Sequence, residues 1–173
     1  FIFTFIHGGL TGIFLGNVVI DLPLSDTYFV VAHFHMVMGV SPVLVVFASL
    51  YHWFPLMSGK MFNETLGKWH FWLTFLGAYS VYLPMHYLGF QGVPRRYFSM
   101  GNTDFLPESA QMLNASITVS AIILALAQLL FFINIFISLR SGKKAKPNCW
   151  GATSPEWLTP DQPPKHGNWA HDL

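Results

Sequence analysis

The stretch YFVVAHFHMVMGVSPVLVVFASLYHWFPLM, residues 28–57, contains no Asp, Glu, Lys or Arg. A transmembrane helix needs roughly 20 predominantly apolar residues, so this stretch can cross a bilayer with residues to spare. We therefore predict that it forms one transmembrane helix that tilts or projects from one face of the membrane. Pro42 and Pro55 are compatible with that helix, because neighbouring helices can satisfy the backbone groups that a proline frees.

Three further segments are long and apolar enough to be transmembrane helices. They are residues 1–20, 69–90 and 113–139. The chain is 53% hydrophobic and only 10% charged, whereas soluble domains carry about 25% charged residues. The expected fold is therefore all-α, a polytopic membrane bundle of four transmembrane helices.

Four glycines recur in the first of these segments. Gly8, Gly9, Gly12 and Gly16 fall about four residues apart along the predicted helix. Small residues at this spacing let the backbones of two helices approach closely. The pattern predicts a face of the first helix that packs tightly against another helix.

The charge and the cysteine content exclude several classes of protein. With a formal net charge of +1, the chain has no broad basic surface, so we expect no nucleic acid as a partner. Its single cysteine, Cys149, excludes an internal disulfide and a two-cysteine metal site, so metal chemistry would have to use histidine. Because the sequence opens at Phe1 inside an apolar run, we expect it to be part of something longer.

The basic residues of the loops predict how the helices are oriented. A basic cluster after the fourth segment places the carboxyl terminus on the cytoplasmic or matrix side: Arg140, Lys143, Lys144 and Lys146. Residues 1–140 are then the membrane part, and residues 141–173 are an extramembrane tail on that side. Arg95 and Arg96 fall in an outer loop, against the usual bias. Either they hold an anionic group, or they are interfacial arginines that snorkel.

Two histidines of the long apolar stretch, His33 and His35, are separated by a single residue. At 3.6 residues per turn, positions two apart lie about 200° apart around the helix axis and about 3 Å apart along it. The two imidazoles therefore leave opposite sides of the helix and cannot share one metal ion. They could hold two separate prosthetic groups, with Phe34 between them. For any single histidine, the alternative is a neutral imidazole hydrogen-bonded to a neighbouring helix.

Two acidic residues, Asp21 and Asp26, lie in the predicted outer loop on the same side as Arg95 and Arg96. Together these four residues could bind a divalent cation and the anionic substituents of a cofactor. The alternatives are that both acids are solvated, or that Asp26 caps the helix that follows it.

The run DTYFVVAHFH, residues 26–35, resembles the tenth-helix signature of haem-copper oxidase subunit I, particularly in cytochrome c oxidase. The resemblance continues in HWFPL at 52–56, PMHYLG at 84–89, PRRY at 94–97, and Glu156-Trp157 followed by Pro163-Pro164. It covers nearly the whole chain, which resembles the last four of that family's twelve transmembrane helices.

This resemblance implies a role for each candidate that would contact a haem. It implies that His33 ligates the oxygen-binding haem and that His35 is one axial ligand of the low-spin haem. Arg95 and Arg96 correspond to the arginines that hold the haem propionates. Asp21 corresponds to an acid beside the propionates of the oxygen-binding haem.

The resemblance also implies the other cofactors. Asp26 corresponds to an acidic ligand of a magnesium site, but the histidine that precedes it in the family is here Ser25. A hydroxyl is a weaker ligand than imidazole for such a site. The implied cofactors are two haems of the haem A type, a copper ion bound by helices outside this sequence, and magnesium at this weakened site.

The implied activity is reduction of dioxygen to water with electrons from cytochrome c, coupled to proton pumping. The implied partners are the N-terminal remainder of subunit I, the copper-binding subunit II, subunit III and other respiratory-complex subunits, all in a lipid bilayer. That bilayer is the mitochondrial inner membrane or the bacterial cytoplasmic membrane. The same helices would suit a quinol oxidase or a nitric oxide reductase, and a haem-free membrane scaffold is an alternative of another class.

Overall fold

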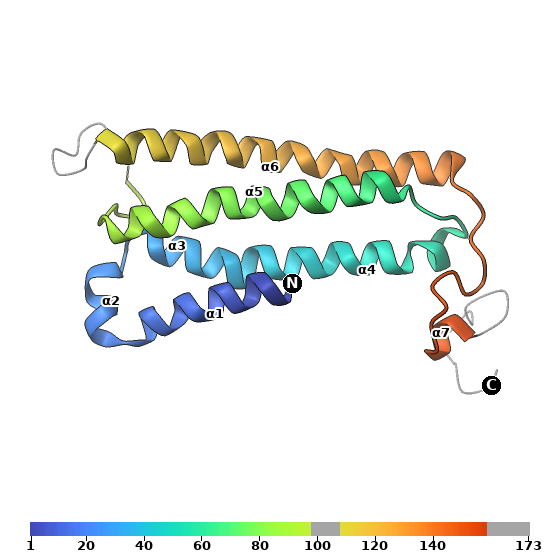
Figure 1. Ribbon diagram of the computed structural model, residues 1–173, viewed down its shortest axis with the longest axis horizontal. Helices are drawn as coiled ribbons and strands as arrows, with labels where there is room; N and C mark the ends of the chain where they lie inside the picture. Colours follow the sequence, from blue (N-terminus) through green and yellow to red (C-terminus); the bar gives the residue numbers. More distant parts are fainter. Residues whose placement is uncertain (98–107, 159–173) are drawn as a thin grey trace.

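The computed structural model describes residues 1–97 and 108–158. Every named element of secondary structure within these residues is a helix. In chain order the elements are α1 (Ile2–Gly16), α2 (Val18–Leu24), α3 (Tyr28–Phe34), the π-helix η1 (His35–Val40), α4 (Ser41–Ser58), α5 (Glu64–Phe90), α6 (Glu108–Ser141) and α7 (Pro155–Leu158). The all-α prediction is therefore confirmed for the described part of the chain (Figure 1).

Helices α3, η1 and α4 follow one another without a break and form a rod of 31 residues, Tyr28–Ser58. Thr27 caps the start of the rod, because its side chain accepts a hydrogen bond of 3.2 Å from the backbone N–H of Phe29. Gly59 ends the rod with a left-handed backbone conformation, φ 67°. The predicted helix over residues 28–57 is thus confirmed.

Helix α1 ends at Gly16, before the end of the segment predicted over residues 1–20. The side chain of Asn17 accepts a hydrogen bond of 3.0 Å from the N–H of Val19 and so caps a second helix. The pair of α1 and α2 is bent by 101°. The prediction of one helix through residue 20 is therefore wrong at its end, because the local hydrogen bond of Asn17 competes with continuation of α1.

Helices α5 and α6 both extend beyond the predicted segments at 69–90 and 113–139. The rod and α6 are each long and apolar enough to cross a bilayer, and the bent pair of α1 and α2 makes a third span if it counts as one. Helix α5 is less apolar than the rod and α6, because Trp, Tyr and His recur along it. By length and composition, the described residues therefore contain two or three apolar spans.

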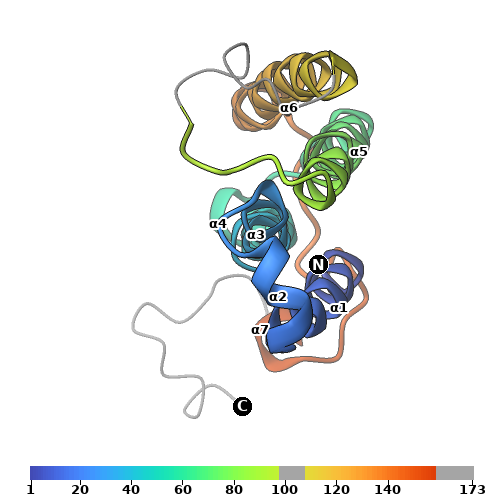
Figure 2. The same ribbon diagram turned by 90° about the vertical axis from the view of Figure 1, so that its left-hand side faces the viewer.

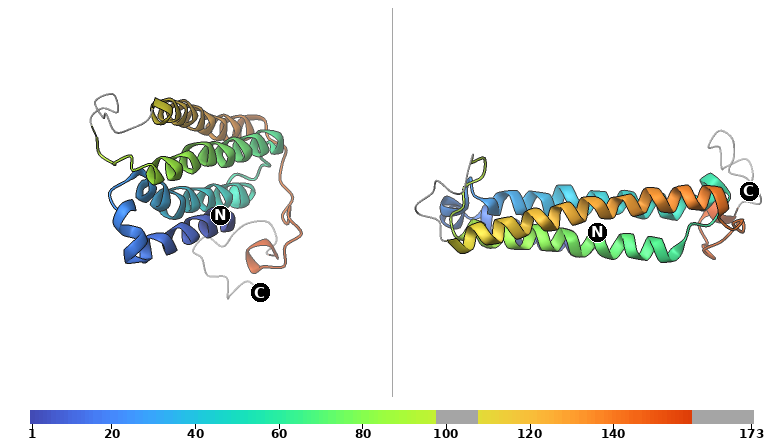
Figure 3. Two further views of the ribbon diagram at one scale, coloured as in Figure 1. Left: turned by 60° about the vertical axis from the view of Figure 1, so that its left-hand side comes forward. Right: turned by 90° about the horizontal axis from the view of Figure 1, so that it is seen from above.

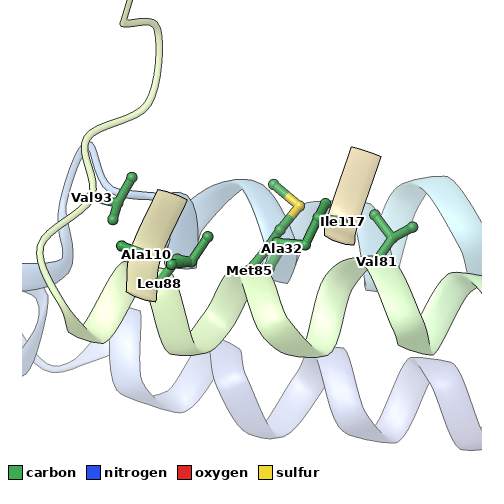
Figure 4. Close-up of a cluster of buried hydrophobic side chains, with 7 residues drawn as sticks. All are labelled: Ala32, Val81, Met85, Leu88, Val93, Ala110 and Ile117. Atoms are coloured by element: carbon green, nitrogen blue, oxygen red, sulfur yellow. The ribbon is translucent and has the colours of Figure 1, made fainter. Parts of the chain in front are cut away.

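The long helices follow one another in the order α6, α5, rod and α1, but they are staggered, so that side chains of α1 and α5 also meet on one side of the rod (Figure 2). Figure 3 shows the same helices from two further sides, and the view from above shows the stagger. The buried cluster in Figure 4 joins α5, the start of the rod and α6: Ala32, Val81, Met85, Leu88, Val93, Ala110 and Ile117. Many large apolar side chains of α1 and α6 are exposed, including Phe132 and Phe136. Exposed apolar surface of this extent requires lipid or further protein to cover it.

Polar contacts join α6 to the loop between the rod and α5. Asn134 and Ser138 of α6 are both buried, and their side-chain oxygens each lie 3.1 Å from the backbone nitrogen of Asn63. The N–H of Met61 donates to the carbonyl of Lys143 at 2.8 Å. These bonds satisfy backbone groups that would otherwise be left without partners at the helix ends.

The described part of the predicted tail, residues 141–158, reaches back to the end of the rod. Trp157 is almost completely buried, and its indole N–H donates to Nε2 of His52 at 3.2 Å. The indole of Trp150 donates to the backbone carbonyl of His52 at 3.0 Å. One residue of the rod thus holds two tryptophans of the tail. The Pro163-Pro164 pair lies outside the described residues.

Gly89 of α5 allows a close approach between α5 and the rod, which generates a prediction. A Cβ atom at this position would overlap the backbone nitrogen of Phe29. We expect Gly89→Ala to push the helices apart and to destabilise the purified membrane protein by about 1–3 kcal/mol, as measured by thermal unfolding in detergent. Gly9→Ala is the control, since an added Cβ there meets nothing within 4 Å. Equal effects of the two substitutions would contradict the close contact.

Candidate functional site

His33 lies on the side of the rod that meets α1. Its Nδ1 is 2.8 Å from the carbonyl oxygen of Gly8 and 3.0 Å from the hydroxyl oxygen of Thr11. Because a carbonyl can only accept a hydrogen bond, Nδ1 carries the proton of the neutral ring and donates it. The other nitrogen, Nε2, therefore keeps its lone pair and can act as a neutral metal ligand.

Two glycines of α1 let it pack closely on the rod beside the His33 ring. A Cβ atom at Gly12 would lie 2.9 Å from Cε1 of His33, and one at Gly8 would overlap a valine of the rod. At Gly9 and Gly16, an added Cβ would meet nothing within 4 Å in the described structure. The predicted tightly packed face therefore consists of Gly8 and Gly12 alone.

His35 leaves the rod on the side of α5. It is the first residue of η1, and its Nδ1 donates to the carbonyl of Val31 at 2.8 Å. The ring stacks on Tyr82 of α5, with the ring centroids 5.0 Å apart and an interplanar angle of 16°. Nε2 is again the nitrogen that keeps its lone pair. The rings of His33 and His35 therefore contact different neighbouring helices, as their spacing in the sequence predicted.

His70 of α5 shows the alternative state of a histidine in this fold. Its Nδ1 lies 3.3 Å from the hydroxyl of Tyr51, and its Nε2 lies 3.1 Å from Oε1 of Gln128. Both ring nitrogens are engaged, so His70 has a structural role and no lone pair left for a ligand. By contrast, within residues 1–97 and 108–158, the hydrogen bonds of His33 and His35 involve only Nδ1.

His33 and His35 each present one imidazole nitrogen with a free lone pair, which is the donor that axial ligation of a haem requires. In the described parts of the chain, no group of three or more His, Cys, Asp or Glu could hold a metal ion. A haem brings its own ring nitrogens to the iron and takes a single imidazole from one side. One free Nε2 on each side of the rod is therefore a suitable donor set for two haems.

Asp26 and Arg95 join the two loops at the start of the rod. Nε of Arg95 donates to Oδ1 of Asp26 at 2.9 Å, and the backbone N–H of Arg95 donates to the carbonyl of Asp26 at 2.8 Å. The N–H of Tyr28 donates to the carbonyl of Val93 at 2.9 Å. The structure thus brings together one of the predicted acids and one of the predicted arginines. Asp26 is not the helix cap, because Thr27 occupies that position.

The other two candidates of this region stay apart from the contact between Asp26 and Arg95. Asp21 lies in the first turn of α2, and its side chain makes no hydrogen bond or ion pair to another described residue. Arg96 has a left-handed backbone, φ 62°, and its side chain likewise forms no ion pair within the part of the chain that the structure covers. The predicted group of two acids and two arginines is therefore only half assembled by these residues.

Sequence reasoning missed the residues that orient the two imidazoles. Thr11 and Tyr82 were not among the predicted site residues, and neither were the backbone carbonyls of Gly8 and Val31. A carbonyl acceptor has no signature in the sequence, because every residue carries one. The glycine spacing in α1 was the one signal that pointed to this contact.

The described residues form long helices that are apolar enough to cross a bilayer, which is the pattern of an integral membrane protein. A family model described as Cytochrome C and Quinol oxidase polypeptide I matches residues 1–123. The chain therefore belongs to the family of subunit I of the cytochrome c and quinol oxidases.

Three relatives illustrate this membership. The chain is 59% identical over its full length to the alternative cytochrome c oxidase subunit 1 of Bradyrhizobium diazoefficiens and covers 29% of that protein. It is 43% identical to cytochrome c oxidase subunit 1 of Synechocystis sp., over 94% of this chain and 28% of the relative. It is also 43% identical to the subunit 1 of Thermostichus vulcanus, over 95% of this chain and 29% of the relative. The chain thus spans less than a third of the length of these curated relatives.

The contact between Asp26 and Arg95 generates a second prediction. The side chain of Asp26 is 74% exposed and that of Arg95 is 27% exposed, so the ion pair should contribute roughly 0.2–1 kcal/mol. Asp26→Asn removes the charge but tolerates the left-handed backbone at this position, φ 62°. We expect a loss of stability of that size, and a smaller one at high salt.

Thermal unfolding at low and high ionic strength measures this loss. Asp26→Val is the comparison, because a β-branched residue is strained in the left-handed conformation. It should cost more than Asp26→Asn at every salt concentration. No loss of stability in Asp26→Asn, or a loss that stays the same at high salt, would show that the ion pair does not hold the two loops together.

Proposed function

We propose that this chain is the C-terminal portion of the catalytic subunit of a terminal respiratory oxidase and that it ligates two haems. The main support is the shared state of His33 and His35, each of which donates Nδ1–H to a backbone carbonyl and keeps Nε2 for a ligand. Membership of the subunit I family supports the same assignment. In this proposal, His33 ligates the oxygen-binding haem and His35 ligates the low-spin haem.

The groups around each imidazole tune it as a ligand. The hydrogen bonds to the carbonyls of Gly8 and Val31 fix the tautomer and make Nε2 a stronger electron donor. When bound, both haems would supply iron that exchanges electrons, and the haem held by His33 would also react with dioxygen. Phe34 alone separates the two ligands along the chain, so the path between the two sites is short.

In the same proposal, the loops at the start of the rod hold the anionic edges of the haems. A guanidinium has five N–H donors, so Arg95 can hold Asp26 and still donate to a propionate. Arg96 would bind a second propionate, and Asp21 would lie beside the propionates of the oxygen-binding haem. Asp26 would contribute to a magnesium site that is weakened by Ser25.

The proposal assigns four transmembrane units to the chain, the last four of twelve: α1 with α2, the rod, α5 and α6. Helix α5 would cross the bilayer despite its polar aromatic residues, because the rod and α6 lie on either side of it (Figure 2). Residues 1–140 would be the membrane part and residues 141–173 a tail on the cytoplasmic or matrix side. The uncovered faces of the row would receive the N-terminal remainder of subunit I, which brings the copper ligands, and subunits II and III.

The electron donor separates two candidate activities, because the family description covers both cytochrome c and quinol oxidases. The printed names of the three relatives all refer to cytochrome c oxidase. We therefore propose reduction of dioxygen to water with electrons from cytochrome c, coupled to proton pumping, with haem A as the haem type. The enzyme would work in a bacterial cytoplasmic or mitochondrial inner membrane.

We expect the purified complex to consume oxygen faster with reduced cytochrome c than with a quinol. An oxygen electrode measures both rates on one preparation, and a pyridine haemochrome spectrum identifies the haem. A rate with quinol that exceeds the rate with cytochrome c would overturn this choice of donor, and it would leave the histidine assignments intact.

The ligand assignments predict that His33 and His35 affect different absorption bands. We expect His33→Asn to abolish or shift the band of the oxygen-binding haem, and His35→Asn to abolish or shift the band of the low-spin haem. Each variant should lose oxygen consumption by at least about tenfold, the lower end of the effect of changing a metal site's supporting groups. Optical spectra of the reduced, purified complex measure the bands.

His70→Gln is the matched control, because His70 is also a histidine of a long helix but has both ring nitrogens engaged. Its spectrum should match that of the unmodified complex, even if its thermal stability falls. If both haem bands survive in the His33 and His35 variants, a haem-free scaffold becomes the better account of this chain.

A further inference from the structure

His86 of α5 is a buried histidine that the proposed function does not use. It is 5% exposed, and its Nδ1 donates to the carbonyl of Tyr82 at 2.8 Å. Nε2 is therefore an acceptor, and it is buried without a hydrogen-bond partner among the described residues. Because residues of this chain already cover Nε2, side chains from other parts of the oxidase would have to displace them to reach it.

A second unsatisfied group lies two turns away on the same helix. The hydroxyl of Tyr79 is also buried and has no hydrogen-bond partner within residues 1–97 and 108–158. A phenolic hydroxyl needs an acceptor for its proton. Tyr79 and His86 thus leave one donor and one acceptor unused in the same interior region.

His7 of α1 lies between these two groups. Its ring centroid is 5.3 Å from that of His86 and 5.4 Å from that of Tyr79. Phe29 of the rod also packs on His86 in a T-shaped arrangement, with the ring centroids 4.9 Å apart and an interplanar angle of 86°. His7 therefore adds two more polar nitrogens at the place where α1 and α5 face each other.

We infer that His7, Tyr79 and His86 form a buried hydration site between α1 and α5, where ordered water donates to Nε2 of His86 and accepts from the hydroxyl of Tyr79. Water is the one small molecule always present that can do both. Buried waters of this kind typically make about three hydrogen bonds to groups that are otherwise unsatisfied. His7 offers further donors and acceptors for the same water molecules.

This hydration site would add polar contacts between α1 and α5, which otherwise meet through aromatic rings such as Phe3 against Phe75 and Tyr79. His7 precedes Gly8, whose carbonyl holds the His33 ring. The water would therefore help to fix the depth of α1 beside the rod. The inference does not depend on the proposed function, because it concerns contacts among residues of this chain alone.

A map of the assembled oxidase at about 2 Å resolution, with waters resolved, tests the site directly. We expect water density within hydrogen-bonding distance of Nε2 of His86. A direct hydrogen bond from His7 or Tyr79 to His86, or the absence of density there, would overturn the inference. So would an ion about 2.0–2.1 Å from the imidazole nitrogens with an anomalous signal, since that is the distance of a bound zinc ion.

Variants of the complex supply an independent measurement. We expect Tyr79→Phe to lower the thermal midpoint and to remove water density, whereas Tyr87→Phe, at an exposed position of the same helix, should change neither. Tyr79→Phe and His7→Leu should be non-additive, because either one disrupts the same water. Strictly additive shifts, or unchanged water density in Tyr79→Phe, would contradict the inference. Neither the thermal midpoint nor the water density in these variants requires a substitution of His86 itself.

Discussion

The hydrogen bond from His33 to the carbonyl of Gly8 connects the fold to the candidate chemistry. It settles which nitrogen carries the proton, because a carbonyl oxygen can only accept. It also requires α1 to lie against the rod at the depth where the carbonyl of Gly8 and the open position of Gly12 face the ring. A side chain at Gly12 would enter the space that the imidazole occupies. The free lone pair of His33 is thus a consequence of helix packing.

His35 also has a protonated Nδ1 and a free Nε2, but here the hydrogen bond lies within its own helix. Its Nδ1 bonds to the carbonyl of Val31, four residues earlier in the same rod, and Tyr82 of α5 supports the ring face. The two imidazoles are therefore oriented by different means, one by a neighbouring helix and one by its own helix. A shift of α1 should disturb His33 much more than His35. This asymmetry suits a proposal in which the two histidines serve different haems.

The open row of helices explains why so much apolar surface remains exposed. In a closed bundle each helix buries one stripe on a common core, whereas here the long helices are spread out and pack mainly on the helix next to them (Figure 2). Few side chains are therefore buried on α1 and α6, at the two ends of the row. Polar contacts at the loops, such as those of Asn63 with Asn134 and Ser138, hold the helix ends in register. The row is consistent with a chain that spans less than a third of its relatives.

Long apolar runs made the rod and α6 predictable, because the bilayer sets a length that sequence can be compared with directly. The spacing of His33 and His35 also predicted that their imidazoles leave opposite sides of the rod, since this follows from helical periodicity alone. The end of α1 was missed because the capping hydrogen bond of Asn17 outweighed an apolar pattern that continues to Ile20. The sequence did not decide whether Asp26 was a ligand or the cap of the following helix. In the structure the neighbouring Thr27 is the cap.

The sequence by itself determined the apolar helices, the shared rod of the two histidines and the family, because these depend on composition and on short-range order along the chain. Only the tertiary structure decided which imidazole nitrogens are engaged, that Asp26 meets Arg95, and that His7 lies beside His86. Each of these is a contact between segments far apart in the sequence, or depends on a backbone carbonyl that every residue carries. Such contacts become visible only when the helices are placed side by side.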